Sequence, residues 1–322
     1  MPRYILECSS LNLELVRNEI HSISISYGEF SVISQISNII VIDGNWEKTR
    51  LSAFVNIVDL ILQESDSPND FDSGLLPDGK YYVRVKRITD IPDTYSESAI
   101  GSILNSEGKI SFKDADFVVR AIRADHWYLT VQIYERDKKA PEQRRAPMRP
   151  FFSPVSLHPR FGIYLVNVSM TRPNETLLDP FCGTGGILIE AALMGRRVIG
   201  SDSSLSMVMG ARLNLKYFGF SDATVINRDI FDLKLDSKVD GIATDMPYGR
   251  NSTLNGREVK DLYERAFEVF HAVLKDGGRC AIVVGDASLL DLANNLFSIE
   301  SAIAVPQHRS LTRYYSVLKK NR

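Results

Sequence analysis

The second half of the chain predicts an α/β domain with a doubly wound, mostly parallel sheet, and a smaller α+β region precedes it. Two observations support this. Beyond residue 175, short buried runs such as TLLDP (176–180) and VDGIATD (239–245) alternate with segments of helical spacing. Before residue 138, strand-like runs dominate and few helices separate them, which indicates modest sheets. In a doubly wound sheet, ligands bind outside the carboxyl ends of the strands.

The first region is predicted to be mainly strands. Its β-branched, aromatic and alternating runs predict strands at 4–8, 38–44, 81–88, 117–122 and 127–135. The apolar spacing in LELVRNEIHSI (13–23) and LSAFVNIVDLILQ (51–63) predicts two helices.

A proline-rich segment then separates the two regions. KKAPEQRRAPMRPFFSP (138–154) contains four prolines, each of which disfavours helix in the residue before it. The segment therefore predicts an extended linker at a domain boundary.

In the second region, strands are predicted at 176–180, 197–202, 223–229, 239–245, 279–285 and 313–318. Helices are predicted at 187–195, 203–219 and 258–274. Ser203 or Ser204 is the expected N-cap of the second of these helices, and Gly219 its C-cap.

Composition narrows the class of protein. The chain has 322 residues, enough for two or more domains, and a formal net charge of −2. It contains no run of about 18 apolar residues and begins without a signal-peptide core, so we expect a cytoplasmic protein without a membrane span. Its three cysteines, Cys8, Cys182 and Cys280, have no CxxC spacing, which argues against a disulfide framework or a zinc site. We expect no metal.

Positive charge is concentrated locally. Lys138–Arg160 contains six basic residues against the single acid Glu142, and a second cluster, Arg84, Lys86 and Arg87, lies on a predicted strand. Such stripes can bind phosphates, and they can equally be solvated surface.

Acidic residues end three successive predicted strands. Asp179 precedes the glycine-rich loop FCGTGG (181–186), Asp202 ends the second strand and Asp229 the third. Glycines allow close approach of a ligand, and an acid about 20 residues further on can hold ribose hydroxyls. A carboxylate beside the loop suits an ammonium group and would repel a pyrophosphate. The three acids therefore predict an S-adenosylmethionine site for its amino-acid end, ribose and adenine.

The fourth strand of this region ends in Asp245-Met246-Pro247-Tyr248. The exocyclic amine of a base is a poor nucleophile because its lone pair is delocalised into the ring. The Asp245 carboxylate and the Met246 carbonyl can accept its protons and relocalise that lone pair towards an incoming methyl group. Pro247 keeps Met246 extended, and Tyr248 can stack on a base that has left its own stack.

These residues resemble a known family. LLDPFCGTGGILIEAALMG with DMPYG resembles the class I methyltransferases of exocyclic amines, whose motif is (D/N)PP(Y/F). RRAPMRPFFSPVSLHPR (144–160) and HRSLTRYY (308–315) resemble the archaeal THUMP-domain tRNA guanine-N2 methyltransferases. VRVKRI (83–88) and the nearby SESAIGSILNS resemble the THUMP core. Met246 departs from the motif, because it replaces the first proline.

The resemblance implies a Rossmann-like methyltransferase domain after a ferredoxin-like and THUMP region. The implied domains are a ferredoxin-like segment at 1–60, a THUMP RNA-binding domain at 61–146, and the linker with the catalytic domain at 147–322. It also implies transfer of one or two methyl groups to N2 of guanosine 10 of tRNA. Guanosine 6 and a non-catalytic RNA-binding module remain alternatives, and a small partner protein is not excluded.

The resemblance assigns residues to three sets. The catalytic set is Asp245, Met246, Pro247 and Tyr248. The cofactor set is Asp179, Phe181, Gly183, Thr184, Gly185, Asp202, Ser203, Asp229, Ile230 and Asp245. The RNA-binding set is Arg84, Lys86, Arg87, Arg144, Arg145, Arg149 and Arg250.

Other enzyme classes fit less well. A nicotinamide-dependent oxidoreductase would need glycine at 188 to complete GxGxxG, but Leu188 is there. Methylation at C5 of a pyrimidine needs a cysteine nucleophile, and Cys182 is expected to be a buried packing residue of the loop. A non-catalytic scaffold would have no need of Asp245 or of the cofactor acids.

Overall fold

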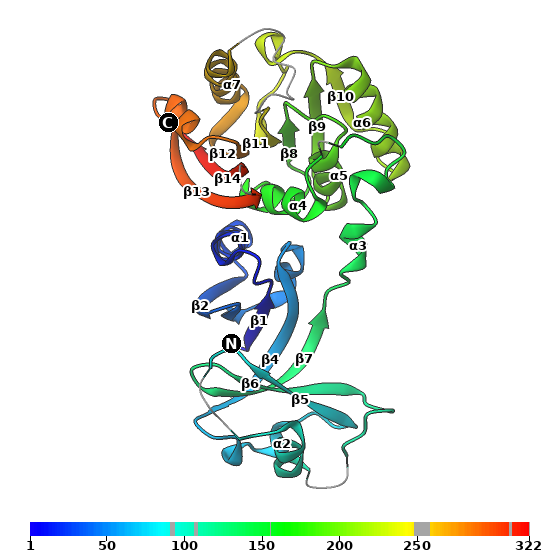
Figure 1. Cartoon of the computed structure of the whole chain (residues 1–322), viewed down its shortest axis with the longest axis vertical. Helices are drawn as coiled ribbons and strands as arrows, with labels where there is room; N and C mark the ends of the chain where they lie inside the picture. The colour runs from blue at the N-terminus through cyan, green and yellow to red at the C-terminus, as the bar shows by residue number, and fades with distance from the viewer. Residues whose placement is uncertain (91–93, 106–108, 155, 248–257, 309–310, 322) are drawn as a thin grey trace. The chain divides into compact units, whose positions relative to one another are not determined.

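The computed structural model describes residues 1–90, 94–105, 109–154, 156–247, 258–308 and 311–321. Tyr248 and Arg250, two predicted site residues, lie outside these ranges. The chain divides into two compact units (Figure 1). Residues 1–50 and 54–138 form the first unit, and residues 51–53 and 139–322 form the second.

The first unit is built on one seven-stranded sheet of order β2-β3-β1-β4-β7-β6-β5. All neighbours are antiparallel except the parallel pair β5 and β6. Helices α1 and α2 each pack on one part of this sheet. The elements are β1 (Arg3–Cys8), α1 (Leu13–Tyr27), β2 (Phe30–Ile36), β3 (Ile39–Gly44), β4 (Val55–Ser65), β5 (Tyr81–Arg87), α2 (Glu97–Leu104), β6 (Phe117–Arg123) and β7 (Trp127–Glu135), with short 3-10 turns at Trp46–Leu51, Pro68–Asp70 and Ser73–Leu75.

The helix predicted at 51–63 is wrong, because residues 55–65 form β4. The run VNIVDLIL is apolar at helical spacing as well as strand-like, so its period did not decide between the two. Tertiary pairing decides, since β4 bonds to β1 on one side and to β7 on the other. The boundary expected at residue 60 therefore falls inside a strand. The five predicted strands of this region are confirmed, whereas β2 was not predicted.

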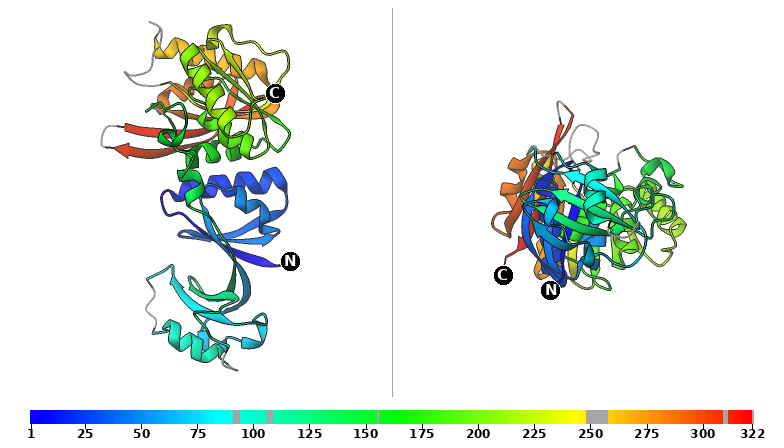
Figure 2. Two further views of the ribbon diagram at one scale, coloured as in Figure 1. Left: turned by 90° about the vertical axis from the view of Figure 1, so that its right-hand side faces the viewer. Right: turned by 90° about the horizontal axis from the view of Figure 1, so that it is seen from below.

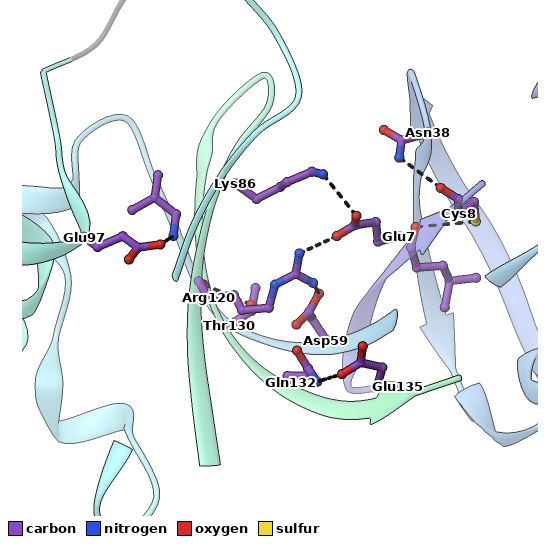
Figure 3. A network of polar contacts seen from close by, with 12 residues as sticks. Glu7, Cys8, Asn38, Asp59, Lys86, Glu97, Arg120, Thr130, Gln132 and Glu135 are labelled. Carbon is purple, nitrogen blue, oxygen red and sulfur yellow. Dashed lines mark hydrogen bonds and ion pairs between the residues drawn. The ribbon is translucent and has the colours of Figure 1, made fainter. Parts of the chain in front are cut away.

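A buried ion network ties four strands of this sheet together (Figure 3). Arg120 on β6 is 5% exposed. It bonds Asp59 on β4 at 2.5 Å and also bonds Glu7 on β1, which in turn pairs with Lys86 on β5 at 3.1 Å. Burial alone would raise the pKa of Glu7, but Arg120 and Lys86 hold it below its usual value. Burial raises the pKa of Asp59 to about 7 in spite of Arg120.

The second unit contains a seven-stranded sheet of order β10-β9-β8-β11-β12-β14-β13. Only β14 runs against the other strands. The chain order reverses between β8 and β11, and a ligand crevice is expected where their carboxyl ends diverge. The elements are α3 (Lys139–Glu142), α4 (Pro159–Val168), β8 (Thr176–Asp179), α5 (Gly186–Leu193), β9 (Arg197–Asp202), α6 (Leu205–Tyr217), β10 (Thr224–Asn227), β11 (Val239–Asp245), α7 (Val259–Val273), β12 (Leu274–Val284), β13 (Phe297–His308) and β14 (Leu311–Lys320), with 3-10 turns at Ala146–Met148, Ile230–Asp232 and Ala287–Ala293.

Helices cover both faces of this sheet. On one face, Tyr164 of α4 packs edge-on against Tyr315 of β14. On the other face, α7 joins an apolar core with alternate residues of β12 and β14, including Ile282 and Leu318. The doubly wound prediction is confirmed, and the predicted strands and helices of this half are present. Helix α4 and strand β13 were not predicted. None of the helices in the described part of the chain is long and apolar enough to cross a membrane.

The linker predicted at 138–154 is not extended throughout. It contains α3 and a 3-10 turn, and it belongs to the second unit from Lys139 onwards. Phe151 shows why. Its backbone N–H and C=O both bond the Asn214 side chain of α6, and its ring lies against Gly210, where a Cβ atom would come within 2.3 Å. Pro141 even lies within α3, so the prolines do not keep the segment extended, and aromatic and basic side chains anchor it to the sheet domain.

Candidate functional site

The four predicted acids lie along one edge of the second sheet. Asp179 ends β8, Asp202 ends β9 and Asp245 ends β11, while Asp229 comes two residues after the end of β10. Register fixes their proximity, because Asn227 pairs with Asp202 across the parallel β9–β10 ladder. Both Asp202 and Asp245 act electrostatically on Asp179. The acids are therefore gathered at one edge, and two of them flank the point where the strand order reverses.

Asp179 is the most buried of the four, at 1% exposed. One of its oxygens accepts hydrogen bonds from the Thr244 hydroxyl at 2.6 Å and from the Phe181 N–H at 3.2 Å. Burial raises the pKa of Asp179 to about 7, and the neighbouring carboxylates Asp202 and Asp245 add to the rise. A buried carboxyl group in this state favours a cationic ligand group, which would compensate its charge.

Asp202 is held by the glycine-rich loop. Its two oxygens accept hydrogen bonds from the N–H groups of Gly183 and Ser204, each at 2.9 Å. A carboxylate oxygen can accept more than one hydrogen bond, so both remain able to bind hydroxyl groups of a ligand. Burial raises the pKa of Asp202. Gly183 has φ +49°, and a Cβ atom there would meet nothing within 4 Å, so the loop has open space beside it.

The remaining residues of the cofactor set cap turns or helices, pack in the core or lie at the surface. Asp229 caps the turn Ile230–Asp232 through the Phe231 N–H at 3.1 Å. Ile230 is only 3% exposed and belongs to the core. Thr184 bonds the Ser156 hydroxyl at 3.2 Å, which fastens the segment before α4 to the loop. Gly185 has φ +81° and caps α5, and Ser203 is exposed.

Met246 has a structural position that its motif did not predict. Its N–H donates to the Val283 carbonyl at 3.0 Å, so the ladder between β11 and β12 continues one residue past Asp245. Its side chain is 1% exposed and packs in the core with Tyr263 and Phe267 of α7. The Tyr263 hydroxyl also donates to the Pro247 carbonyl at 3.4 Å. The described part of the predicted catalytic loop is therefore fixed by the sheet and by α7.

Leu188 and Cys182 are both packing residues in this structure. Leu188 is fully buried and packs against Gly200 of β9, where a Cβ atom would come within 2.5 Å of it. Cys182 is 5% exposed beside the same glycine, and burial raises the pKa of its thiol. Both side chains fill the contact between the loop and β9. Cys182 is thus a packing residue, as predicted.

Two arginines predicted to contact RNA are inside the domain instead. Arg144 forms a two-point ion pair with Glu190 of α5, at 2.8 and 2.7 Å, and Glu190 is 1% exposed. Arg149 is 5% exposed, donates to the Arg144 carbonyl and lies over Gly186. Arg149 is therefore buried and Arg144, with its side chain 17% exposed, is engaged by Glu190, so neither is a ready surface cation, and their assignment to the RNA-binding set stays a prediction. Arg145 is about half exposed, in a pair with Glu142.

The basic cluster of the first unit remains at the surface. Arg84 is 52% exposed by side chain, lies over the rings of Tyr82 and Phe112, and pairs with Glu97. Lys86 is 40% exposed and Arg87 donates to the Tyr95 carbonyl. These cations have protein partners of their own, so any phosphate they bind would compete with those partners.

An α/β sheet that reverses at β8 and β11, with acids at that edge and a glycine loop, defines an S-adenosylmethionine-dependent methyltransferase domain. The family model described as the RMKL-like methyltransferase domain matches residues 146–315. The chain belongs to this family and is a methyltransferase.

Two archaeal enzymes are similar to this chain in sequence, and a crystal structure is similar to it in fold. The chain is 35% identical to the tRNA (guanine(10)-N2)-dimethyltransferase of Methanothermobacter thermautotrophicus, over 95% of this chain and 96% of the relative. It is 36% identical to the Pyrococcus abyssi enzyme of the same name, over 69% and 68%. The crystal structure of TrmN from Thermus thermophilus has the same fold, with a TM-score of 0.59 and 24% identity over 99% of this chain and 100% of that one.

Proposed function

We propose that this protein transfers methyl groups from S-adenosylmethionine to the exocyclic N2 amine of a guanosine in tRNA, at position 10. The observation that carries the proposal is Asp245 at the carboxyl end of β11, next to the buried Asp179 and followed by a loop fixed to the sheet. Relatives that share about a third of their residues with this chain, one of them over nearly its whole length, are named for this reaction.

The acid edge suits the three parts of the cofactor. Asp179 would hold the ammonium group, since a buried carboxyl beside two other acids favours a cation. Asp202 would accept hydrogen bonds from the ribose hydroxyls, and Asp229 from the adenine amino group. The open space at Gly183 leaves room for the part of the cofactor that joins these groups. When bound, S-adenosylmethionine supplies an electrophilic methyl group on a sulfonium ion.

Asp245 and the Met246 carbonyl would act on the acceptor amine. Both can accept N–H bonds from the guanine amine, which turns its lone pair out of conjugation and towards the methyl group. Because the sheet fixes the backbone of both residues, the acceptors are positioned before the base arrives, and alignment supplies much of the rate. The proton released from the methylated nitrogen can pass to Asp245 or to water.

The first unit would hold the tRNA. Its residues 61–138 cover most of the region that resembles a THUMP domain, and Arg84, Lys86 and Arg87 offer surface cations for phosphate contacts. Arg145 can add a contact on the second unit, since its side chain is 54% exposed. Such contacts fix the position of the RNA without reading its sequence. A tRNA substrate also favours a location in the cytoplasm.

One experiment tests the proposal. The protein is incubated with unmodified tRNA transcripts and isotope-labelled S-adenosylmethionine, and the digested RNA is mapped by mass spectrometry. We expect N2-methylguanosine, or its dimethyl form, at position 10, and none in a transcript with adenosine at that position. Label at guanosine 6 would correct the position, whereas unlabelled RNA with active cofactor binding would refute the proposal.

A further inference from the structure

The carboxylate of Asp245 has a cationic neighbour from a distant part of the chain. Nη1 of Arg313, on β14, lies 3.7 Å from Oδ2 of Asp245. The side chains are 19% and 21% exposed, so both charges are largely withdrawn from water. At 3.7 Å the contact is electrostatic, since it is longer than a hydrogen bond. Catalytic contacts of this kind often tighten only when the substrate binds.

The fold brings Arg313 to this edge. β14 pairs with β12 up to Tyr314 and Val284, while Asp245 of β11 pairs with Val283. Arg313 is therefore one residue beyond the ladder, at the level of the acid edge. The β13–β14 hairpin, red in Figure 2, extends past the other strands of its sheet. The described charged and titratable groups near Asp245 include Asp179 from β8 and Arg313 itself. Asp202 of β9 acts on Asp179, and the Tyr263 hydroxyl of α7 bonds the Pro247 carbonyl nearby.

The strand that carries Arg313 is held firmly in the domain. Tyr315, two residues along β14, is fully buried and packs against the tilted ring of Phe161 and edge-on against Tyr164, both of α4, with ring centroids 5.1 and 5.8 Å away. A guanidinium group on a strand fixed in this way returns to one place, so it can hold the carboxylate in one orientation.

We propose that Arg313 is a positioning residue for methyl transfer: it orients Asp245 and keeps it in the carboxylate form, ready to accept a proton of the guanine amine. Asp245 shares its edge with Asp179 and Asp202, and like charges favour protonation. A protonated Asp245 would donate a proton where the reaction needs an acceptor. The positive charge of Arg313 opposes that protonation. This inference rests on the proposed function of Asp245.

Three variants test the inference. Arg313→Met removes the charge and keeps much of the side-chain volume, and Arg313→Lys restores a charge. Arg279→Met is the matched control, because Arg279 pairs with Glu300 at 2.6 Å in the same sheet but lies in the middle of β12, opposite Gly241 of β11 and away from Asp245. Full-length proteins are assayed for cofactor affinity by calorimetry, for kcat and KM with tRNA transcripts, and for the pH dependence of kcat.

We expect Arg313→Met to lower kcat at neutral pH by about tenfold or more while the cofactor Kd stays within about twofold. The acid limb of its pH profile should move up by about one unit, so activity should recover in alkali. Arg313→Lys should restore part of kcat, and Arg279→Met should keep the wild-type profile. Equal kcat and an unmoved acid limb in folded Arg313→Met would overturn the inference. Failure of the proposed function is distinct, because the wild-type protein itself would then leave tRNA unmethylated.

Discussion

Met246 offers a sharp test of how the catalytic loop is held. In the motif that this chain resembles, proline occupies this position, so Met246→Pro would restore the motif. The structure predicts a loss of stability and rate, because proline has no N–H to donate to the Val283 carbonyl. Proline also cannot fill the space of the buried methionine side chain. Restoring the motif should therefore weaken this particular protein.

The expected loss in the free energy of unfolding is the sum of two contributions, the unpaired carbonyl and the lost side-chain packing. An unsatisfied buried carbonyl costs about 1–3 kcal/mol, and partial loss of a buried methionine adds about 1–2 kcal/mol. The sum of about 2–5 kcal/mol corresponds to roughly 5–15 °C in the melting temperature of a unit of this size. A displacement of Asp245 by about 1 Å can lower the rate by about a hundredfold.

Two further variants separate the contributions. Met246→Leu keeps the N–H and the volume, so it should lose less than about 1.5 kcal/mol and retain most of kcat. Met246→Ala keeps the N–H but leaves a cavity of several methyl groups, at a cost of about 2–5 kcal/mol. Scanning calorimetry and single-turnover methyl transfer are measured on all three. A Met246→Pro protein that matches or exceeds the wild type in stability and rate would refute this reasoning.

Three more predictions follow from the described contacts. Because the pKa of Asp179 is raised to about 7, this carboxyl must lose a proton when the cofactor's ammonium binds at low pH. The affinity for S-adenosylmethionine should therefore fall as the pH is lowered from about 8 to about 6. Calorimetry in buffers of different ionisation enthalpy should detect this proton release in the wild type and not in Asp179→Asn. Joint replacement of Arg84, Lys86 and Arg87 by alanine should weaken tRNA binding and reduce the slope of log K against log salt by about 2–3, as measured by titration at several salt concentrations; an unaltered slope would assign these cations to the solvated surface. Glu190→Ala removes the buried carboxylate that holds the partly buried Arg144 and should cost about 3 kcal/mol in denaturant unfolding, with a wild-type midpoint as the contrary result.

The sequence was most informative where several signals coincide. Strand β11 has the bounds predicted from its apolar run, and Asp179, Asp202 and Asp245 fall at strand ends as expected. Each of these positions follows from a short strand that stops at a polar or glycine-rich turn. Parallel strands share one carboxyl edge, so predicting the strands was enough to gather the acids.

Local sequence pattern is a poor guide where tertiary context decides the structure. The run at 55–65 carries apolar residues at two periods, and only pairing with β1 and β7 makes it a strand. Arg144 and Arg149 lie in a basic stretch, but the partner that draws Arg144 inside, Glu190, is 46 residues further along the chain. A count of local charge cannot reveal such a partner.

Arg313 shows the same limit for the site itself. It lies within HRSLTRYY (308–315), yet no local signal links it to Asp245, which is 68 residues earlier in the chain (313 − 245). The link requires β14 to lie beside β12, an antiparallel insertion that alternating strands and helices do not predict. The sequence likewise shows Met246 only as a departure from the motif, whereas the structure shows that its N–H extends the ladder to β12.

The central claim is that Asp245 acts on the acceptor amine and is not needed to hold the cofactor. Cofactor affinity by calorimetry and single-turnover methylation of a tRNA transcript, measured together on Asp245→Ala, test it most directly. We expect the variant to bind S-adenosylmethionine within a few-fold of the wild type and to lose transfer by about a hundredfold or more. Wild-type turnover in Asp245→Ala, or a loss of activity fully explained by lost cofactor binding, would contradict the claim.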